Sequence, residues 1–347
     1  MIQVAAVTAV LLFVIQVLVL VYILYKKSKA KRFEAKVEKY FTKNLSAYLS
    51  FISGEHMHEP RLPESGDLKK EILERILNEV SGNSSDPEQL SNIQRIAQSH
   101  LSERYETTLL KGKWADRVNT LYFIEDFKMT NVSGQVWQHL TKIQNKDEEY
   151  RQTLRVLASF QDERLIDYLI QEQDISLGLI KELLRRLNSG SFEYLVSLIE
   201  DGDTDVPQVI EEAFISYCGE SRNYEFMRFV ERKIEDDRKE IRLKAFRSLC
   251  NYQYTSDTNS IKAFFSSEYW EERMYAARLS GIMNLEEYIS DLIRLAGDST
   301  WWVRFAACEA IKINPGGEDI LHSIVSGHED SYARDMAKQT LTMKGGM

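Results

Sequence analysis

An arginine recurs at nearly constant intervals in the C-terminal half of the chain, and this periodicity constrains the fold more than any other feature. Neighbouring members are about 30 residues apart, and an alanine follows each of them three residues later. A period of this length is typical of stacked helical units, because a unit this small buries its apolar face only against its neighbours. The recurring arginines are Arg242, Arg273, Arg304 and Arg334.

The residues around Arg304 indicate how one unit is built. Apolar side chains recur there at spacings of three and four residues, which places them on one face of a helix. Residues 284–297 form a second helical pattern with bulkier apolar side chains. Each unit is therefore expected to be a pair of helices, and the chain to be all-α. The first helix carries small or branched residues that allow close packing: Val303, Ala306, Ala307, Ala310 and Ile311.

The order of a bulky helix, an aspartate, a short turn, Val-Arg and Ala-Ala resembles the short HEAT repeats that also occur in phycobilisome-lyase-like proteins. This resemblance implies a right-handed α-solenoid of stacked helix pairs, in which an aspartate and an arginine brace the turn of each repeat. Ser267 and His328 take the aspartate's place in the repeats of Arg273 and Arg334, which leaves the bracing there open. The matching pairs are Asp236 with Arg242 and Asp298 with Arg304.

The pattern weakens toward the N-terminus but does not stop. Arg151 and Arg117 occupy the arginine's place without the following alanine, and the stretch between residues 151 and 242 contains helical patterns of the right length. About seven units fit between residue 100 and the end of the chain at this period. We therefore expect the HEAT-like solenoid to cover residues 113–347 and a helical cap region to cover 68–112.

The beginning of the chain is apolar enough to cross a membrane. Residues 2–25 contain no charged side chain, and a helix of this length spans the hydrocarbon layer of about 30 Å. The segment lacks the basic start, the short apolar core and the small-residue cleavage site of a secretory signal. We therefore expect residues 1–25 to be a retained transmembrane helix that anchors a single-pass protein in the cell membrane.

A basic cluster follows this helix directly and predicts its orientation. By the positive-inside rule, residues 26–347 are expected in the cytoplasm, with the cluster at the membrane surface. Three widely separated cysteines agree with a reducing compartment. The cluster consists of Lys26, Lys27, Lys29, Lys31 and Arg32.

Residues 26–52 are predicted to form a basic, amphipathic juxtamembrane helix, and residues 53–67, with two glycines and two prolines, a linker. Four arrangements of residues 33–52 remain open. They could continue the membrane helix, lie on anionic lipid, pair with a copy of themselves, or pack against the domain as an ordinary helix.

Charge and motifs exclude several function classes. The chain carries a net charge of −9 although its first 43 residues are basic, so the remainder is strongly acidic and nucleic acid is not an expected partner. There is no phosphate-binding glycine loop, nucleophile elbow, kinase signature or paired-cysteine metal site. The His-Glu pairs at 58–59 and 328–329 resemble those of deoxyhypusine hydroxylase, but that family has four pairs within its repeats. We therefore expect no catalytic, cofactor-binding or metal-binding residues.

A surface for partner proteins remains. Solenoids present one concave face, and positions one and five residues after the repeat arginines supply arginines and large apolar side chains, which often anchor partners. Of the adjacent tryptophans, one is expected in the core and the other on the surface. The candidate protein-binding residues are Arg247, Met274, Arg278, Trp301, Trp302, Phe305 and Glu309.

The sequence thus predicts a membrane-anchored HEAT-repeat scaffold or adaptor that is not an enzyme. Its expected partners are the bilayer and a membrane-associated protein. Anchored proteins with similar repeats can accompany polymer-synthesising glycosyltransferases, so the resemblance points to a subunit of a polysaccharide-synthesis machine. Two alternatives remain: an enzyme that uses a groove of the solenoid, metal-dependent or lyase-like, and a structural membrane protein that assembles with itself through residues 1–52.

Overall fold

The computed structural model describes residues 2–172 and 174–343, with side chains described from residue 11 onward. Every regular element in these residues is a helix, so the predicted all-α class is confirmed. The chain divides into two compact units, Met1–Asp162 and Glu163–Met347, so a unit boundary falls within the region predicted as one solenoid. Each unit is described by itself.

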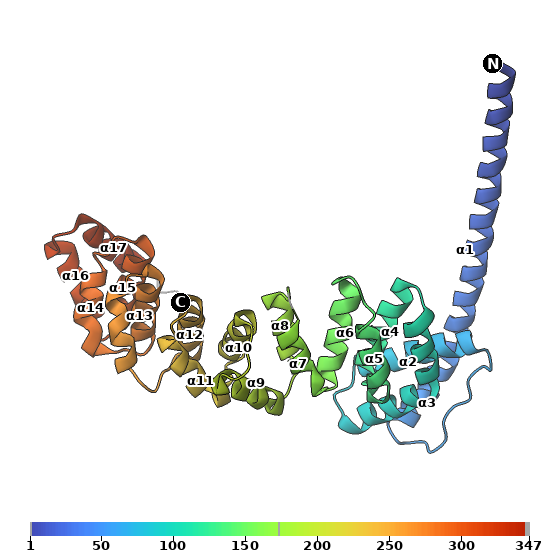
Figure 1. The fold of residues 1–347 in the computed structure, drawn as a ribbon, viewed down its shortest axis with the longest axis horizontal. Coiled ribbons are helices and arrows are strands. Elements are labelled where there is room, and N and C mark those ends of the chain that lie inside the picture. The colour runs from blue at the N-terminus through green and yellow to red at the C-terminus, as the bar shows by residue number, and fades with distance from the viewer. Residues whose placement is uncertain (1, 173, 344–347) are drawn as a thin grey trace. The chain divides into compact units, whose positions relative to one another are not determined.

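The first unit begins with one long helix, α1, that covers Ile2–Ile52 without a break (Figure 1). Its N-terminal part carries exposed apolar side chains from Leu11 to Tyr25 and is long and apolar enough to cross a membrane. Its C-terminal part is packed, and Tyr48 has no exposed surface at all. The helix therefore joins an uncovered apolar segment directly to the core of this unit.

The packed end of α1 contacts two helices, α2 (Gly66–Ser81) and α3 (Pro87–Lys111). Arg75 on α2 pairs with Glu38 on α1 at 2.7 Å from Nη2 to Oε2, and its guanidinium covers the ring of Phe41. For this part of α1 the structure thus describes two of the four alternatives, since the segment continues the apolar helix and also packs against the domain.

The linker after α1 is held against the helices by Glu59. Its Oε1 accepts a hydrogen bond from the Tyr48 hydroxyl at 3.1 Å and lies 2.6 Å from Nε2 of His100. Lys69 Nζ lies 3.0 Å from the other ring nitrogen of His100. Burial and the Glu59 carboxylate together raise the pKa of Tyr48, so its hydroxyl stays a hydrogen-bond donor. The first unit is completed by α4 (Trp114–Asp126), η1 (Thr130–Val132), α5 (Ser133–Leu140) and α6 (Glu148–Ser159).

The second unit is a succession of helices in which those with repeat arginines lie next to each other. Helix α12 contacts α10 and α13, and α15 contacts α13 and α17. The elements are α7 (Arg164–Gln171), α8 (Leu177–Leu184), α9 (Ser189–Asp201), α10 (Gln208–Ser221), η2 (Tyr224–Phe226), α11 (Met227–Arg232), η3 (Lys233–Glu235), α12 (Lys239–Tyr252), η4 (Asn259–Ser266), α13 (Trp270–Ile282), η5 (Glu286–Tyr288), α14 (Ile289–Leu295), α15 (Trp301–Ile313), α16 (Gly317–Gly327) and α17 (Ser331–Thr342).

Each recurring arginine of this unit binds the backbone of the turn before its own helix. Nη1 donates to the carbonyls six and five residues earlier, which would otherwise lack a partner. Because the acceptor is a carbonyl, this bond does not require an aspartate, and it also forms at Ser267 and His328. The bonds run from Arg242 to Asp236 (2.8 Å), Arg273 to Ser267 (2.7 Å), Arg304 to Asp298 (2.7 Å) and Arg334 to His328 (2.5 Å).

The aspartate side chains have other partners than the resemblance implies. The carboxylate of Asp298 pairs with Arg273 of the preceding repeat, 2.7 Å from Nε, and not with Arg304. The carboxylate of Asp236 pairs with Arg238 at 2.8 Å. The arginines therefore join consecutive repeats as well as bracing single turns.

The two weaker arginine positions of the first unit differ from each other. Arg117 donates to the carbonyl of Gly112 at 2.7 Å and pairs with Glu149, as the strong repeats do. Arg151 is exposed and makes no side-chain hydrogen bond within the described part of the chain, so the prediction that it plays the same role is wrong.

Glycine allows two pairs of these helices to approach closely. A Cβ added to Gly281 on α13 would lie 2.6 Å from the Cβ of Ala310 on α15, which no real side chain tolerates. Gly219 on α10 faces Ser248 on α12 in the same way. Small residues at these crossings bring the helices, and the side chains that flank them, close together.

Candidate partner-binding surface

Three arginines of the second unit line one hollow of about 560 Å³ at the surface of α10, α12 and α13. We call it the arginine hollow, after Arg222, Arg247 and Arg278. Arg247 and Arg278 occupy equivalent places in two consecutive repeats, on the exposed sides of α12 and α13. The structure thus brings together the two arginines that the sequence singles out for partner binding.

Arg222 reaches the hollow from the residue that ends α10. Its backbone is left-handed, with φ 51° and ψ 42°, a conformation that favours glycine. Gln253, one repeat later, ends α12 in the same conformation with φ 61° and also lines the hollow. Both positions thus retain a long polar side chain at some cost in backbone strain.

The positive charge of the hollow is not neutralised. Within the described residues, no carboxylate forms an ion pair with Arg222, Arg247 or Arg278. Glu220 is the acidic residue among those lining the hollow, and its Oε1 is bound by Nζ of Lys181 at 2.5 Å. Lys181 therefore holds this carboxylate and leaves the three guanidinium groups available for an external anion.

The other groups in the hollow suit binding and not nucleophilic chemistry. Burial raises the pKa of the Cys250 thiol to about 12, so this side chain stays protonated at neutral pH. Asn251 and Gln253 add amide groups that donate and accept hydrogen bonds. Guanidinium groups offer pairs of parallel N–H donors that match a carboxylate or a phosphate. The donors of the hollow thus match the geometry of a carboxylate or phosphate group.

A second group of predicted residues forms an aromatic cluster at the start of α15. The rings of Trp301 and Phe305 are stacked with centroids 5.2 Å apart, and Trp302 meets Trp301 edge-on at 4.7 Å. Trp301 is 41% exposed and Trp302 is 55% exposed. The expectation that one of the two tryptophans lies in the core is wrong, because Val303 occupies the buried position of that turn.

The remaining predicted surface residues do not reach the hollow. Met274 on α13 and Glu309 on α15 are half-buried, and neither lines it. Oε1 of Glu309 is buried without a hydrogen-bond partner in the described residues. The predicted surface thus separates into the arginine hollow, the aromatic cluster and these two isolated side chains.

The sequence prediction did not include Arg222 or Gln253, nor the ion pair between Glu220 and Lys181. A signal for the first two was present, since residues 222 and 253 follow the same period as the repeat arginines. Periodicity could not reveal the ion pair, because Lys181 lies on α8, in a repeat where the arginine pattern is lost.

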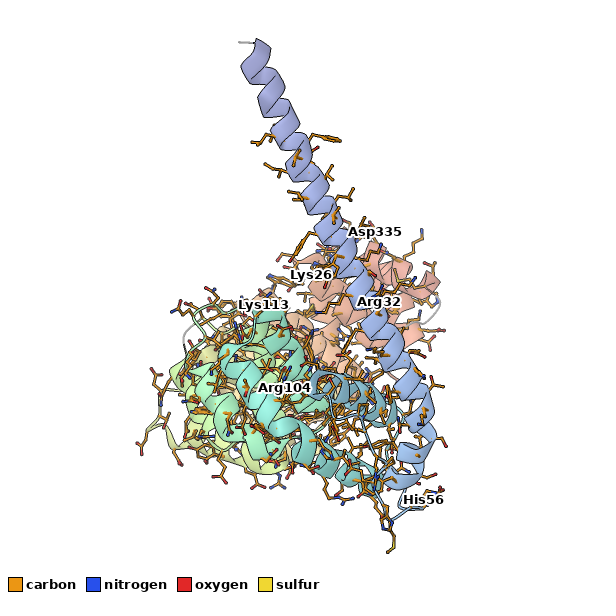
Figure 2. All side chains as sticks on the ribbon, turned by 90° about the vertical axis from the view of Figure 1, so that its right-hand side faces the viewer. Lys26, Arg32, His56, Arg104, Lys113 and Asp335 are labelled. Atoms are coloured by element: carbon orange, nitrogen blue, oxygen red, sulfur yellow. The ribbon has the colours of Figure 1, made fainter. Side chains whose placement is uncertain are left out.

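The predicted membrane-surface residues lie on α1. Lys26, Lys27, Lys29, Lys31 and Arg32 are all exposed, between the apolar stretch and the packed end of the helix. Figure 2 labels Lys26 and Arg32 on this part of α1, and His56 just beyond its packed end. No group of three His, Cys, Asp or Glu side chains that could hold a metal ion occurs among the residues the structure describes.

Comparisons with known proteins do not assign a family. No protein-family model matches the chain, and no curated protein matches it. Among solved structures, it is similar to a crystal structure of an engineered protein with 14% identity and a TM-score of 0.33, over 82% of this chain and 87% of that one. A second engineered protein matches with 16% identity and a TM-score of 0.22, over 78% of this chain and 94% of the other.

Proposed function

We propose that this chain is a membrane-anchored scaffold that binds a partner protein through the arginine hollow. The observation that carries the proposal is the set of three exposed arginines on α12, on α13 and at the end of α10, none of them paired with a carboxylate of the described chain. Unpaired guanidinium groups gathered in one place are a common anchor for a partner. In an acidic chain they are not explained by the general charge of the surface.

The anchor is the second part of the proposal. The exposed apolar side chains of α1 are suited to lipid, and the basic residues after them favour a cytoplasmic location of both units. The continuity of α1 into the core of the first unit supports a retained helix over a cleaved signal sequence, since cleavage would cut a continuous helix. Restriction to the bilayer raises the effective concentration of the scaffold toward membrane partners.

The finer fold belongs to the same proposal. We interpret the repeat arginines, their backbone bonds and the neighbouring positions of α10, α12, α13, α15 and α17 as a right-handed, short-HEAT-type solenoid. In such a fold every repeat offers a similar surface, so a partner segment can contact several repeats at once.

Photocrosslinking in living cells tests the scaffold role. A photoreactive residue replaces Asn251, which lines the hollow, and in a control chain it replaces Arg228, which lies outside it on α11. We expect one partner protein to crosslink at position 251 and not at 228, and the crosslink to disappear in the double variant Arg247→Glu, Arg278→Glu. Position 251 giving only the products of position 228 would contradict the proposal.

Topology is tested separately by protease protection. With inside-out vesicles, both units should be digested by added protease, whereas right-side-out vesicles should protect them. The opposite pattern would contradict the cytoplasmic location, and full release of the chain by alkaline carbonate would contradict the anchor.

A further inference from the structure

The arginine hollow shows which kind of segment it fits, an inference that rests on the proposed partner binding. We propose that it binds an extended, acidic peptide segment of the partner, in which carboxylates about three residues apart contact successive arginines. Three features support this occupant: the spacing of the arginines, the residues around them, and the ion pair between Glu220 and Lys181.

Spacing favours a chain with several charges over a single small anion. Arg247 and Arg278 are repeat-equivalent residues on neighbouring helices, which pack with axes about 8–10 Å apart. A segment with several carboxylates can offer each arginine its own bidentate acceptor, whereas a single carboxylate has only two oxygens to share among them. In an extended peptide, residues three positions apart are separated by about 10 Å, which is close to the distance between the axes of the two helices. Arg222, the residue that ends α10, is not repeat-equivalent to these two arginines but adds a third guanidinium group to the same hollow.

The surroundings of the arginines favour a peptide over a nucleic acid. None of the described residues that line the hollow is aromatic, so no platform is available for stacking a base. The amide side chains of Asn251 and Gln253 are suited to the N–H and C=O groups of an extended backbone. The hollow also belongs to a chain with a net charge of −9, which would repel a long polyanion elsewhere on its surface.

The Lys181–Glu220 ion pair favours the binding of an external carboxylate in the hollow. Without Lys181, the Glu220 carboxylate would be free to compete for the arginines that surround it. An internal carboxylate competes effectively, because it is held at high local concentration. Lys181 therefore acts as a positioning residue for binding, although it does not itself line the hollow.

The test uses the full chain in detergent micelles and a fluorescein-labelled peptide with glutamate at every third position and glycine or serine between. We expect saturable binding that weakens with salt, and no binding by the same peptide with glutamine in place of glutamate. Arg247→Gln and Arg278→Gln should each weaken binding about tenfold, because each removes a charged hydrogen-bonding partner.

Three further variants separate the hollow from general charge. Arg228→Gln removes the same charge from another exposed arginine, which lines a hollow where acidic side chains balance the basic ones, and it should not change the affinity. Glu220→Gln should strengthen binding, and Lys181→Gln should weaken it. Because all of these side chains lie at the surface or its edge, the thermal unfolding midpoints should stay close to that of the parent.

Four results would overturn the inference. They are equal binding of the glutamine peptide, unchanged affinity in both hollow variants, an equal loss in Arg228→Gln, and displacement of the peptide by inorganic phosphate at equal concentration, which would indicate a site for small anions. The partner crosslink at position 251 is measured independently of the peptide, so failure of this inference and failure of the proposed function are distinguishable.

Discussion

Arg273 joins two consecutive repeats, because its Nε lies 2.7 Å from the carboxylate of Asp298 while its Nη1 donates to the backbone carbonyl of Ser267. Both side chains of this ion pair are largely buried. One guanidinium therefore satisfies the turn of its own repeat and the acid of the next, which couples the stability of the two.

Replacement of Arg273 by alanine should destabilise the second unit strongly. The change leaves the Asp298 carboxylate buried without its partner and frees two carbonyls, and we expect the free energy of unfolding to fall by about 3–5 kcal/mol. Urea unfolding followed by circular dichroism measures this. Arg151→Ala, at an exposed arginine of the same repeat pattern, is the control and should change the value by less than about 0.5 kcal/mol.

Gly281→Ala should destabilise the contact between α13 and α15. The added methyl group would lie 2.6 Å from the Cβ of Ala310, so the helices must move apart, at a cost of about 1–3 kcal/mol. Ala310→Gly in the same chain should recover only part of the loss, since it removes the Cβ in conflict but leaves the Cα of residue 310, which is equally close at 2.6 Å. A double-mutant cycle by thermal unfolding checks this, and additive effects would argue against the close approach.

Acidification should weaken the first unit through His139. Burial lowers the pKa of this imidazole below its ordinary value of 6.5, although the nearby Glu149 opposes the shift. The folded form therefore binds a proton less readily than the unfolded chain, so stability is greatest at neutral pH and falls as the pH drops below about 6.5. Unfolding midpoints at pH 7.5 and 5.5 measure the effect.

His139→Gln is the matched variant for that measurement, because glutamine keeps a hydrogen bond toward Glu149 without titrating. Its unfolding midpoint should depend less on pH across this range than that of the parent. An unchanged dependence would assign the effect to other groups.

Arg222→Gly should separate stability from binding. Glycine adopts the left-handed backbone of this position without strain, so we expect the free energy of unfolding to stay equal or rise by up to about 1 kcal/mol. The acidic peptide should nevertheless bind more weakly, because one of its three guanidinium partners is lost. A parallel loss of stability would instead assign Arg222 a structural role.

The repeat and the helical class could be read from the sequence because both depend on local spacing. Arg242, Arg273, Arg304 and Arg334 stand at one period, and that period is sufficient to locate four turns of the second unit. The partners of these arginines could not be predicted in the same way. A backbone carbonyl has no sequence signature, and the Asp298–Arg273 pair crosses from one repeat to the next.

The candidate site was predictable only in part for a similar reason. Arg247 and Arg278 follow the period directly, whereas Arg222 depends on a left-handed residue at the end of α10. The exposure of both Trp301 and Trp302 depends on the rotation of α15, which the buried Val303 determines. Large aromatic side chains are usually expected in cores, so residue type alone predicts one buried tryptophan where the structure has two exposed ones.

Helix α1 is one continuous helix about 75 Å long. Val37 and Tyr48 are buried on the same rod that carries the exposed apolar segment, and no hinge residue separates the two parts. If the exposed apolar end lies in a membrane, as we propose, a turn or tilt of that end would be transmitted to the first unit. With α1 as the proposed anchor, the orientation of that unit would follow the tilt of the helix, which depends on the thickness of the bilayer.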